Sequence, residues 1–150
     1  MKKTLLPVAA LLALLLAGTL LRSWLIGGDA ALPATELSVP DSCTLVQQPC
    51  RLPSGYQVRV LGDMKVLEPF IVELAGPGIS GAEIDFQMPG MNMGINRFRF
   101  ARVRQDLWQV RVIIPVCASA RLDWIATIDF VSDAEKSIRK RIVLPLLMNR

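Results

Sequence analysis

Apolar and polar residues alternate in short runs along most of this chain, and turn residues separate the runs. The alternation begins near Ser54 and recurs over 56–60, 70–74, 84–88, 98–101, 108–114, 122–130 and 139–144. A period of two is typical of β-strands that bury one face. Seven short strands with turns about every 8–12 residues favour an all-β, immunoglobulin-like β-sandwich. We expect Trp108 and Trp124 to anchor its core, each with a hydrogen-bond partner for the indole N–H.

The N-terminus has a different pattern. Residues 4–21 form an uncharged, mostly apolar run, with Lys2 and Lys3 before it and Arg22 and Trp24 after it. A helix needs roughly 20 apolar residues to cross a bilayer, so the run is just long enough. A cleaved secretory signal is the alternative, but its apolar core normally spans only ~7–15 residues and ends at a small-residue site. The longer run, which is poor in such sites, favours one uncleaved transmembrane helix.

The organisation of the chain follows from this anchor. Lys2 and Lys3 would keep the N-terminus in the cytoplasm and place the remainder on the far side of the membrane. We predict an anchor over residues 1–26, a tether rich in Gly, Ala and Pro over 27–41, and an exported sandwich domain over 42–150.

Charge says little about a partner. The formal net charge is +4, from 17 basic and 13 acidic residues, but Lys2, Lys3 and Arg22 belong to the predicted anchor. The exported part is therefore nearly neutral. It has no basic helix and no glycine-rich phosphate loop, so we do not expect it to bind nucleic acid.

A cluster of arginines has two interpretations. Long basic side chains alternate with apolar residues at positions 97, 99, 102, 104 and 111. They are explained either as the solvated face of a sheet or as a docking surface for an acidic partner.

The predicted export of the domain bears on the state of its three cysteines. In an oxidising compartment two of them are expected to pair, and Cys43 and Cys50 lie close enough to close a small loop ahead of the first clear strand. Cys117 is then left over. It is either a small buried apolar residue or a thiol kept for a ligand.

The absence of histidine restricts the chemistry. The chain contains no histidine, which removes the commonest general base near neutral pH and the usual ligand of zinc and Cu(II). Ser119 lies near Cys117 without an activating base, no carboxylate pair has a recognisable spacing, and no Cys-x-x-Cys motif is present. We therefore expect that the protein is not an enzyme.

Sulfur is concentrated in one segment instead. Met88, Met91 and Met93 lie within six residues, in Met-Pro-Gly-Met-Asn-Met. Thioethers suit Cu(I), and Gly90 and Gly94 permit backbone conformations that would let the methionines converge.

A third accessible donor would strengthen such a site. If the strand after Met93 pairs with the strand that ends at Ile114, that hairpin would bring Cys117 beside Met93. The candidate metal ligands are thus Met88, Met91, Met93 and Cys117. The alternative is that Met88 and Cys117 are core residues, while Met91 and Met93 fill gaps or form a flexible contact surface.

The order of these features resembles a known type of protein. The anchor, the cysteine pair, Met91-Asn-Met-Gly-Ile-Asn-Arg97 and Ile114-Pro-Val-Cys117 resemble small membrane-anchored exported proteins of Gram-negative bacteria. More distantly, the chain is similar to the immunoglobulin-like domains of the FixH and YtkA type. The resemblance implies a single-pass inner-membrane protein with a periplasmic domain, acting in copper handling or in assembly of a respiratory oxidase. A metal-free module that contacts another envelope protein is the second hypothesis.

Overall fold

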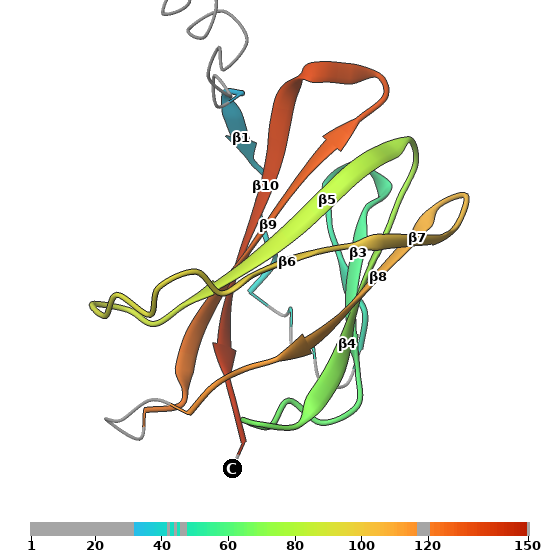
Figure 1. The fold of residues 1–150 in the computed structure, drawn as a ribbon. Coiled ribbons are helices and arrows are strands. Elements are labelled where there is room, and N and C mark those ends of the chain that lie inside the picture. Colours follow the sequence, from blue (N-terminus) through green and yellow to red (C-terminus); the bar gives the residue numbers. More distant parts are fainter. Residues whose placement is uncertain (1–31, 42, 44, 46–47, 117–120, 150) are drawn as a thin grey trace, which may run out of the picture. The chain divides into compact units, whose positions relative to one another are not determined.

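The computed structural model in Figure 1 describes residues 32–41, 43, 45, 48–116 and 121–149. Residues Pro33–Arg150 form one compact unit, separate from Met1–Leu32. The predicted anchor over residues 1–26 lies outside the described residues. Within the described part of the chain, no helix is both long and apolar enough to cross a membrane.

The compact unit is built from two sheets of five strands each. Sheet A has the order β1-β10-β9-β5-β6, from strands Ala34–Glu36, Glu135–Leu147, Asp123–Ser132, Ile79–Gln87 and Arg97–Arg99. Sheet B has the order β2-β3-β4-β8-β7, from strands Cys50–Arg51, Gln57–Leu61, Pro69–Ala75, Leu107–Ile113 and Ala101–Arg104. A 3-10 turn, η1, covers Pro53–Gly55 between β2 and β3.

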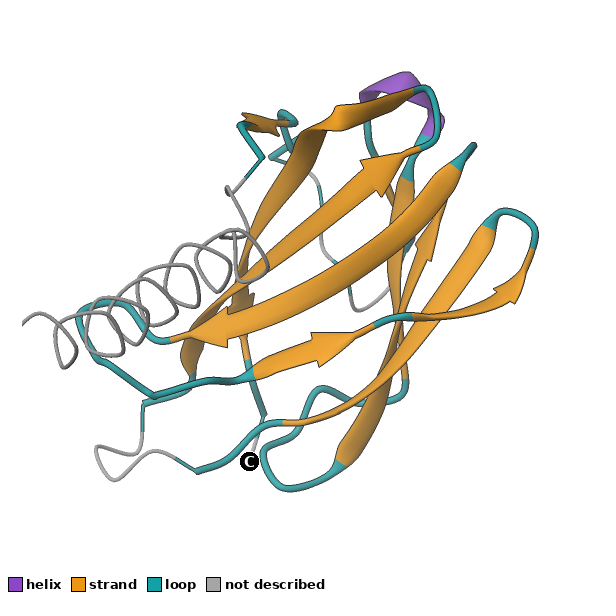
Figure 2. Cartoon of the chain, turned by 45° about the horizontal axis from the view of Figure 1, so that its top comes forward, coloured by secondary structure: helices purple, strands orange, loops and turns teal. Residues whose placement is uncertain are grey.

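The sheets form a sandwich-like, all-β arrangement, and Figure 2 shows them as two layers. The apolar positions of the alternating runs point between the layers, so that Val58, Leu74, Ile128 and Ile142 are all essentially inaccessible to solvent. Phe70 of sheet B meets Phe86 of sheet A edge to face, with ring centroids 6.3 Å apart. Burial of this face is the main source of stability expected for a domain of this size.

All seven predicted strands are present, as β3, β4, β5, the β6–β7 segment, β8, β9 and β10. Two strands were not predicted. Residues 34–36, which the sequence placed in the tether, form β1 and pair in parallel with β10 from Ala34 opposite Arg139 to Glu36 opposite Arg141. All three side chains of β1 are exposed. β1 is held through its backbone, so no hydrophobic pattern in the sequence marks it. β2 has only two residues, which are too few to form a pattern.

The segment predicted as one strand over 98–101 changes sheets. β6 pairs with β5 in sheet A, whereas β7 pairs with β8 in sheet B. The crossing occurs at Phe100, which is buried and donates its N–H to the Ala82 carbonyl oxygen at 3.0 Å. The cluster of arginines is therefore divided between the two sheets. Arg97 lies near Glu83 and Asp85 of sheet A, with N–O distances of 3.7 and 3.8 Å.

The two tryptophans differ in one respect from the expectation. Both are buried, with Trp124 1% and Trp108 8% exposed, as core anchors should be. However, neither indole Nε1–H has a hydrogen-bond acceptor among the described residues. Burying an unpaired N–H costs free energy, so these groups require an explanation beyond packing.

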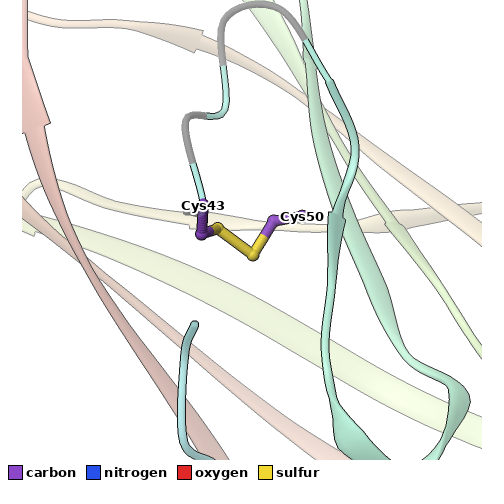
Figure 3. The surroundings of a disulfide bond; sticks show 2 residues. All are labelled: Cys43 and Cys50. Atoms are coloured by element: carbon purple, nitrogen blue, oxygen red, sulfur yellow. A yellow bond between two sulfur atoms is a disulfide. The ribbon is translucent and has the colours of Figure 1, made fainter. Parts of the chain in front are cut away.

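The predicted disulfide is present in the structure. Cys43 and Cys50 are joined, with their Cα atoms 5.0 Å apart (Figure 3). Cys50 is buried at the start of β2 and Cys43 packs against the core. The bond therefore fastens the segment before β2 to the edge of sheet B.

Candidate functional site

The three methionines lie in the connection between β5 and β6, which we call the methionine loop (residues 88–96). Its first four residues form a tight turn, in which the Met91 N–H donates to the Met88 carbonyl oxygen at 3.1 Å. Pro89 and Gly90 occupy the central positions, and Gly90 has a φ of +74°. Proline followed by a residue with positive φ is the signature of a type II turn. The sequence-based expectation for this turn is confirmed.

Polar side chains hold the rest of the loop. The Asn92 side-chain oxygen accepts the Gly94 N–H at 3.0 Å, and the Asn96 side-chain amide donates to the Met93 carbonyl oxygen at 3.2 Å. The Gln87 amide donates to the Gly94 carbonyl oxygen at 3.1 Å. Gly94 has a φ of +70°, which other residues rarely adopt. The backbone around Met91 and Met93 is thus specified by its own sequence.

The sulfur side chains differ in their accessibility. Met88 is 2% exposed and belongs to the core. Met91 and Met93 are partly buried and pack against the core. Cys117, the fourth predicted ligand, lies outside the described residues. Of the predicted ligands that the structure describes, only Met91 and Met93 therefore reach the surface.

One arginine connects the methionine loop to the segment after Cys117. Arg121 donates from Nη1 to the Pro89 carbonyl oxygen at 3.0 Å. The same guanidinium binds the Asp123 carboxylate through two nitrogens, with Nε 2.8 Å from Oδ1. The hydrogen bond from Arg121 lowers the pKa of Asp123 below its ordinary value. The β8–β9 connection, which carries Cys117, is thereby attached to the turn that carries Met91.

The strand pairing on which the predicted approach of Cys117 to Met93 depended is not present. The sequence suggested that a hairpin would bring Cys117 beside Met93. However, β6, the strand that follows Met93, belongs to sheet A, whereas β8 belongs to sheet B. Only β7, beyond the crossing at Phe100, pairs with β8. Hairpin pairing therefore does not place residues 115–117 beside Met93. Sequence reasoning also missed Arg121, because a bond from arginine to a distant carbonyl leaves no pattern along the chain.

Most of the exposed apolar side chains lie at one end of the sandwich. The end that carries the methionine loop, which we call the loop end, includes the β3–β4 connection, the last residues of β8 and the end of β10 (Figure 1). Of the six large apolar residues that are exposed in the described part of the chain, five lie there: Leu67, Ile95, Ile113, Val116 and Leu147. Exposed apolar side chains that gather in this way mark interaction sites more often than scattered ones do.

Leu67 stands out among these residues. It is 65% exposed and has a φ of +62°, a conformation that is uncommon for residues other than glycine. Its N–H donates to the Ile114 carbonyl oxygen at 2.9 Å, which ties the β3–β4 connection to the end of β8. The same connection also reaches sheet A, because the Val66 N–H donates to the carbonyl oxygen of Asn149, just beyond β10, at 3.2 Å.

The donor set at the loop end fits a soft metal ion better than a hard one. In the part of the chain that the structure describes, no three His, Cys, Asp or Glu side chains cluster to hold a metal. The thioethers of Met91 and Met93 are neutral sulfur donors, which suit Cu(I) and not Mg²⁺ or Ca²⁺.

Comparisons with known proteins do not identify a family for this chain. No family model matches the chain, and no curated protein matches it. Among solved structures, the sulfur carrier protein SoxY from Chlorobium limicola f thiosulfatophilum is similar, with a TM-score of 0.41 and 12% identity over 87% of this chain and 96% of that chain. A likeness at this level says nothing about what the chain does.

Proposed function

We propose that this protein is a membrane-anchored accessory protein of the bacterial envelope that binds Cu(I) at its loop end through Met91, Met93 and the thiol of Cys117. In this proposal residues 1–26 are a single-pass inner-membrane helix, and the sandwich is an immunoglobulin-like periplasmic domain. Neutral thioethers need no deprotonation before they bind metal, so such a site would exchange Cu(I) readily, as a metallochaperone requires.

The observation that carries the proposal is the hydrogen bond from Arg121 to the Pro89 carbonyl oxygen. Arg121 follows Cys117 by four residues, and Pro89 precedes Met91 by two. Four residues of extended backbone span at most about 14 Å, and the Arg121 side chain adds its own length to the largest separation between Cys117 and the methionine turn. Two sulfur donors alone would bind Cu(I) weakly, so we propose the thiol of Cys117, which belongs to the same β8–β9 connection as Arg121, as the third ligand.

The loop end is distant from β1 along β10. β1 runs parallel to β10, and Ala34 pairs with Arg139, eight residues before Leu147. At about 3.3 Å per residue, β10 therefore extends roughly 26 Å from that point to the loop end. A respiratory oxidase or another envelope protein would receive the metal at the loop end.

A competition titration tests the metal. The full chain in detergent micelles is titrated with Cu(I) against a chromogenic chelator, without oxygen and with ascorbate as the reductant. The protein is compared with the triple variant Met91→Leu, Met93→Leu, Cys117→Ser. We expect the parent to capture one equivalent and the variant to lose it.

Met64→Leu is the matched control. Met64 is a buried methionine outside the methionine loop, and leucine nearly conserves its volume. This variant should capture Cu(I) like the parent. Equal, negligible capture by the parent and the triple variant would overturn the metal site.

The exposed apolar residues favour a second candidate function, a metal-free contact module for an envelope protein. Ile95 is 92% exposed at the tip of the methionine loop and Leu147 is 71% exposed at the end of β10. Methionine side chains adapt well to such contacts. Leucine at positions 91 and 93 keeps the apolar contact but removes the sulfur. A partner complex that survives these substitutions would favour contact over metal transfer.

A further inference from the structure

A second candidate site lies at the edge of β5, and it does not depend on the proposed metal site. β6 pairs with β5 over residues 83–85 only, and the chain then leaves sheet A at Phe100. Beyond that point, residues 79–81 of β5 pair with β9 on one side, and no described strand pairs with them on the other. Natural sheets usually protect such an edge with Lys, Pro or a covering segment. Here the edge carries Ser80 and Gly81.

A cleft of about 480 Å³ lies along this edge. Its lining comes from both faces of sheet A. Ala82, Phe100 and Trp108 contribute from the apolar interior between the sheets, whereas Glu83, Arg99 and Arg139 contribute from the outer face. The cleft is open at Gly81, because a Cβ atom there would meet no other atom within 4 Å.

Two groups in the cleft lack partners. The Trp108 indole Nε1–H has no acceptor among the described residues, although the side chain is only 8% exposed. The Arg99 guanidinium forms no ion pair with a described carboxylate. The acidic groups nearby are already engaged, because Glu83 lies 3.7 Å from Arg97 and Asp129 binds Arg141 at 2.8 Å. The cleft thus offers a buried donor and an uncompensated positive charge.

We propose that this cleft binds an extended peptide segment of a partner protein, which adds to sheet A along residues 79–81 and places an acidic side chain beside Arg99. Successive side chains of a strand point to opposite faces. A strand added here would direct one side chain inward against Trp108 and Phe100, and the next outward to Arg99. A cleft that reaches both faces of one edge fits this geometry, which is that of peptide recognition by strand addition. A carbonyl or side-chain oxygen of the peptide would accept the Trp108 N–H.

A random peptide display library is the probe. It is selected against the full chain in lipid nanodiscs, with empty nanodiscs for counter-selection. We expect enriched peptides in which acidic and apolar residues alternate. The affinity of an enriched, fluorescein-labelled peptide is then measured by fluorescence polarisation, and hydrogen exchange at residues 79–81 should slow when that peptide is bound.

Two variants test the cleft independently. Gly81→Leu places a side chain where a Cβ atom would meet no other atom within 4 Å, and Arg99→Glu reverses the unpaired charge. Each should weaken peptide binding by at least about tenfold, which corresponds to about 1.4 kcal/mol. Arg111→Glu is the matched control, because Arg111 is exposed on sheet B and forms no described ion pair.

Several results would overturn the proposal. These are the absence of enrichment over empty nanodiscs, affinities that Gly81→Leu and Arg99→Glu leave unchanged, and an effect of Arg111→Glu as large as that of Arg99→Glu. Unchanged exchange at residues 79–81 in the bound state would exclude strand addition. None of these outcomes affects Cu(I) capture at the loop end, so the two proposals fail separately.

Discussion

The Arg121 guanidinium bridges two connections of the sandwich, because it donates to the Pro89 carbonyl oxygen at 3.0 Å while it binds the Asp123 carboxylate. Asp123 is the first residue of β9, and Pro89 lies in the turn after β5. The carboxylate holds the arginine in the orientation that reaches Pro89. The methionine loop is therefore positioned by a charged pair that contains no sulfur ligand.

This bridge gives a prediction about pH. The hydrogen bond from Arg121 lowers the pKa of Asp123 below its ordinary value of 3.8. A carboxyl group whose pKa is lowered by folding stabilises the fold above its ordinary pKa, and the contribution is lost as the pH falls through the lowered value. Arg121→Ala should raise the pKa of Asp123 toward 3.8. Carbon NMR of the carboxyl group measures this change. An Asp123 titration that is identical in the parent and in Arg121→Ala would contradict the bridge.

Gly76 gives a second prediction, about packing. A Cβ atom at this position would lie 2.2 Å from Cδ1 of Tyr56. The Tyr56 ring is itself buried and packs edge-on against Phe130, with centroids 4.8 Å apart, so it has little room to move. Gly76→Ala should lower the free energy of unfolding by about 1–3 kcal/mol, the usual cost of overpacking. Denaturant unfolding followed by tryptophan fluorescence measures it.

Gly81→Ala is the matched control for Gly76→Ala. Its Cβ meets open space, so its free energy of unfolding should stay within about 1 kcal/mol of the parent value. Equal stabilities of the two variants would show that Tyr56 does not crowd Gly76.

Much of the sandwich could be predicted because burial imposes a period of two on each strand. Val58 and Val60 of β3, and Phe70 and Leu74 of β4, were placed correctly for that reason. The crossing at Phe100 could not be predicted, because periodicity records which side chains are buried and not which strand is the neighbour. Pairing is decided by contacts between distant parts of the chain.

The candidate site was predictable only in its local part. Proline and glycine specify the turn at residues 88–91, and Gly94 specifies the later part of the loop, whatever the tertiary structure. The contact between Arg121 and Pro89 joins residues 32 positions apart, and it depends on the pairing of β5 with β9 in sheet A. The exposed apolar residues of the loop end likewise come together only in the folded chain, because they lie in four separate parts of the sequence.

The disulfide gives a third prediction. Cys43 and Cys50 are bonded, so the unfolded chain without reductant should show one reactive thiol, that of Cys117. Cys43→Ser together with Cys50→Ser should lower the free energy of unfolding by about 2–3 kcal/mol, because the short loop would no longer be closed in the unfolded state. A thiol assay in denaturant and an unfolding titration measure the two quantities. Three reactive thiols per chain would contradict the pairing.

Glu73 gives the last prediction, because it is a buried carboxylate on the outer face of sheet B. It lies in β4 between Arg59 of β3 and Gln109 of β8, each directly opposite it in the sheet register. Arg59 donates to it from Nε at 2.7 Å, and the Gln109 side-chain amide donates to its other oxygen. These neighbours cover Glu73 so that it is only 5% exposed, although its position in the alternation points outward.

Glu73→Gln should therefore destabilise the domain by about 1.5–3 kcal/mol, the usual worth of hydrogen bonds to a charged group. Arg59 is half exposed, so its coupling to Glu73 in a double-mutant cycle with Arg59→Gln should be smaller than this, at about 1 kcal/mol. Glu68→Gln is the control, because Glu68 is exposed and its nearest described cation, Lys65, is 3.9 Å away. Its effect should stay within about 0.5 kcal/mol. If both glutamate variants unfold at the same denaturant concentration, the carboxylate of Glu73 does not stabilise the packing of β3, β4 and β8.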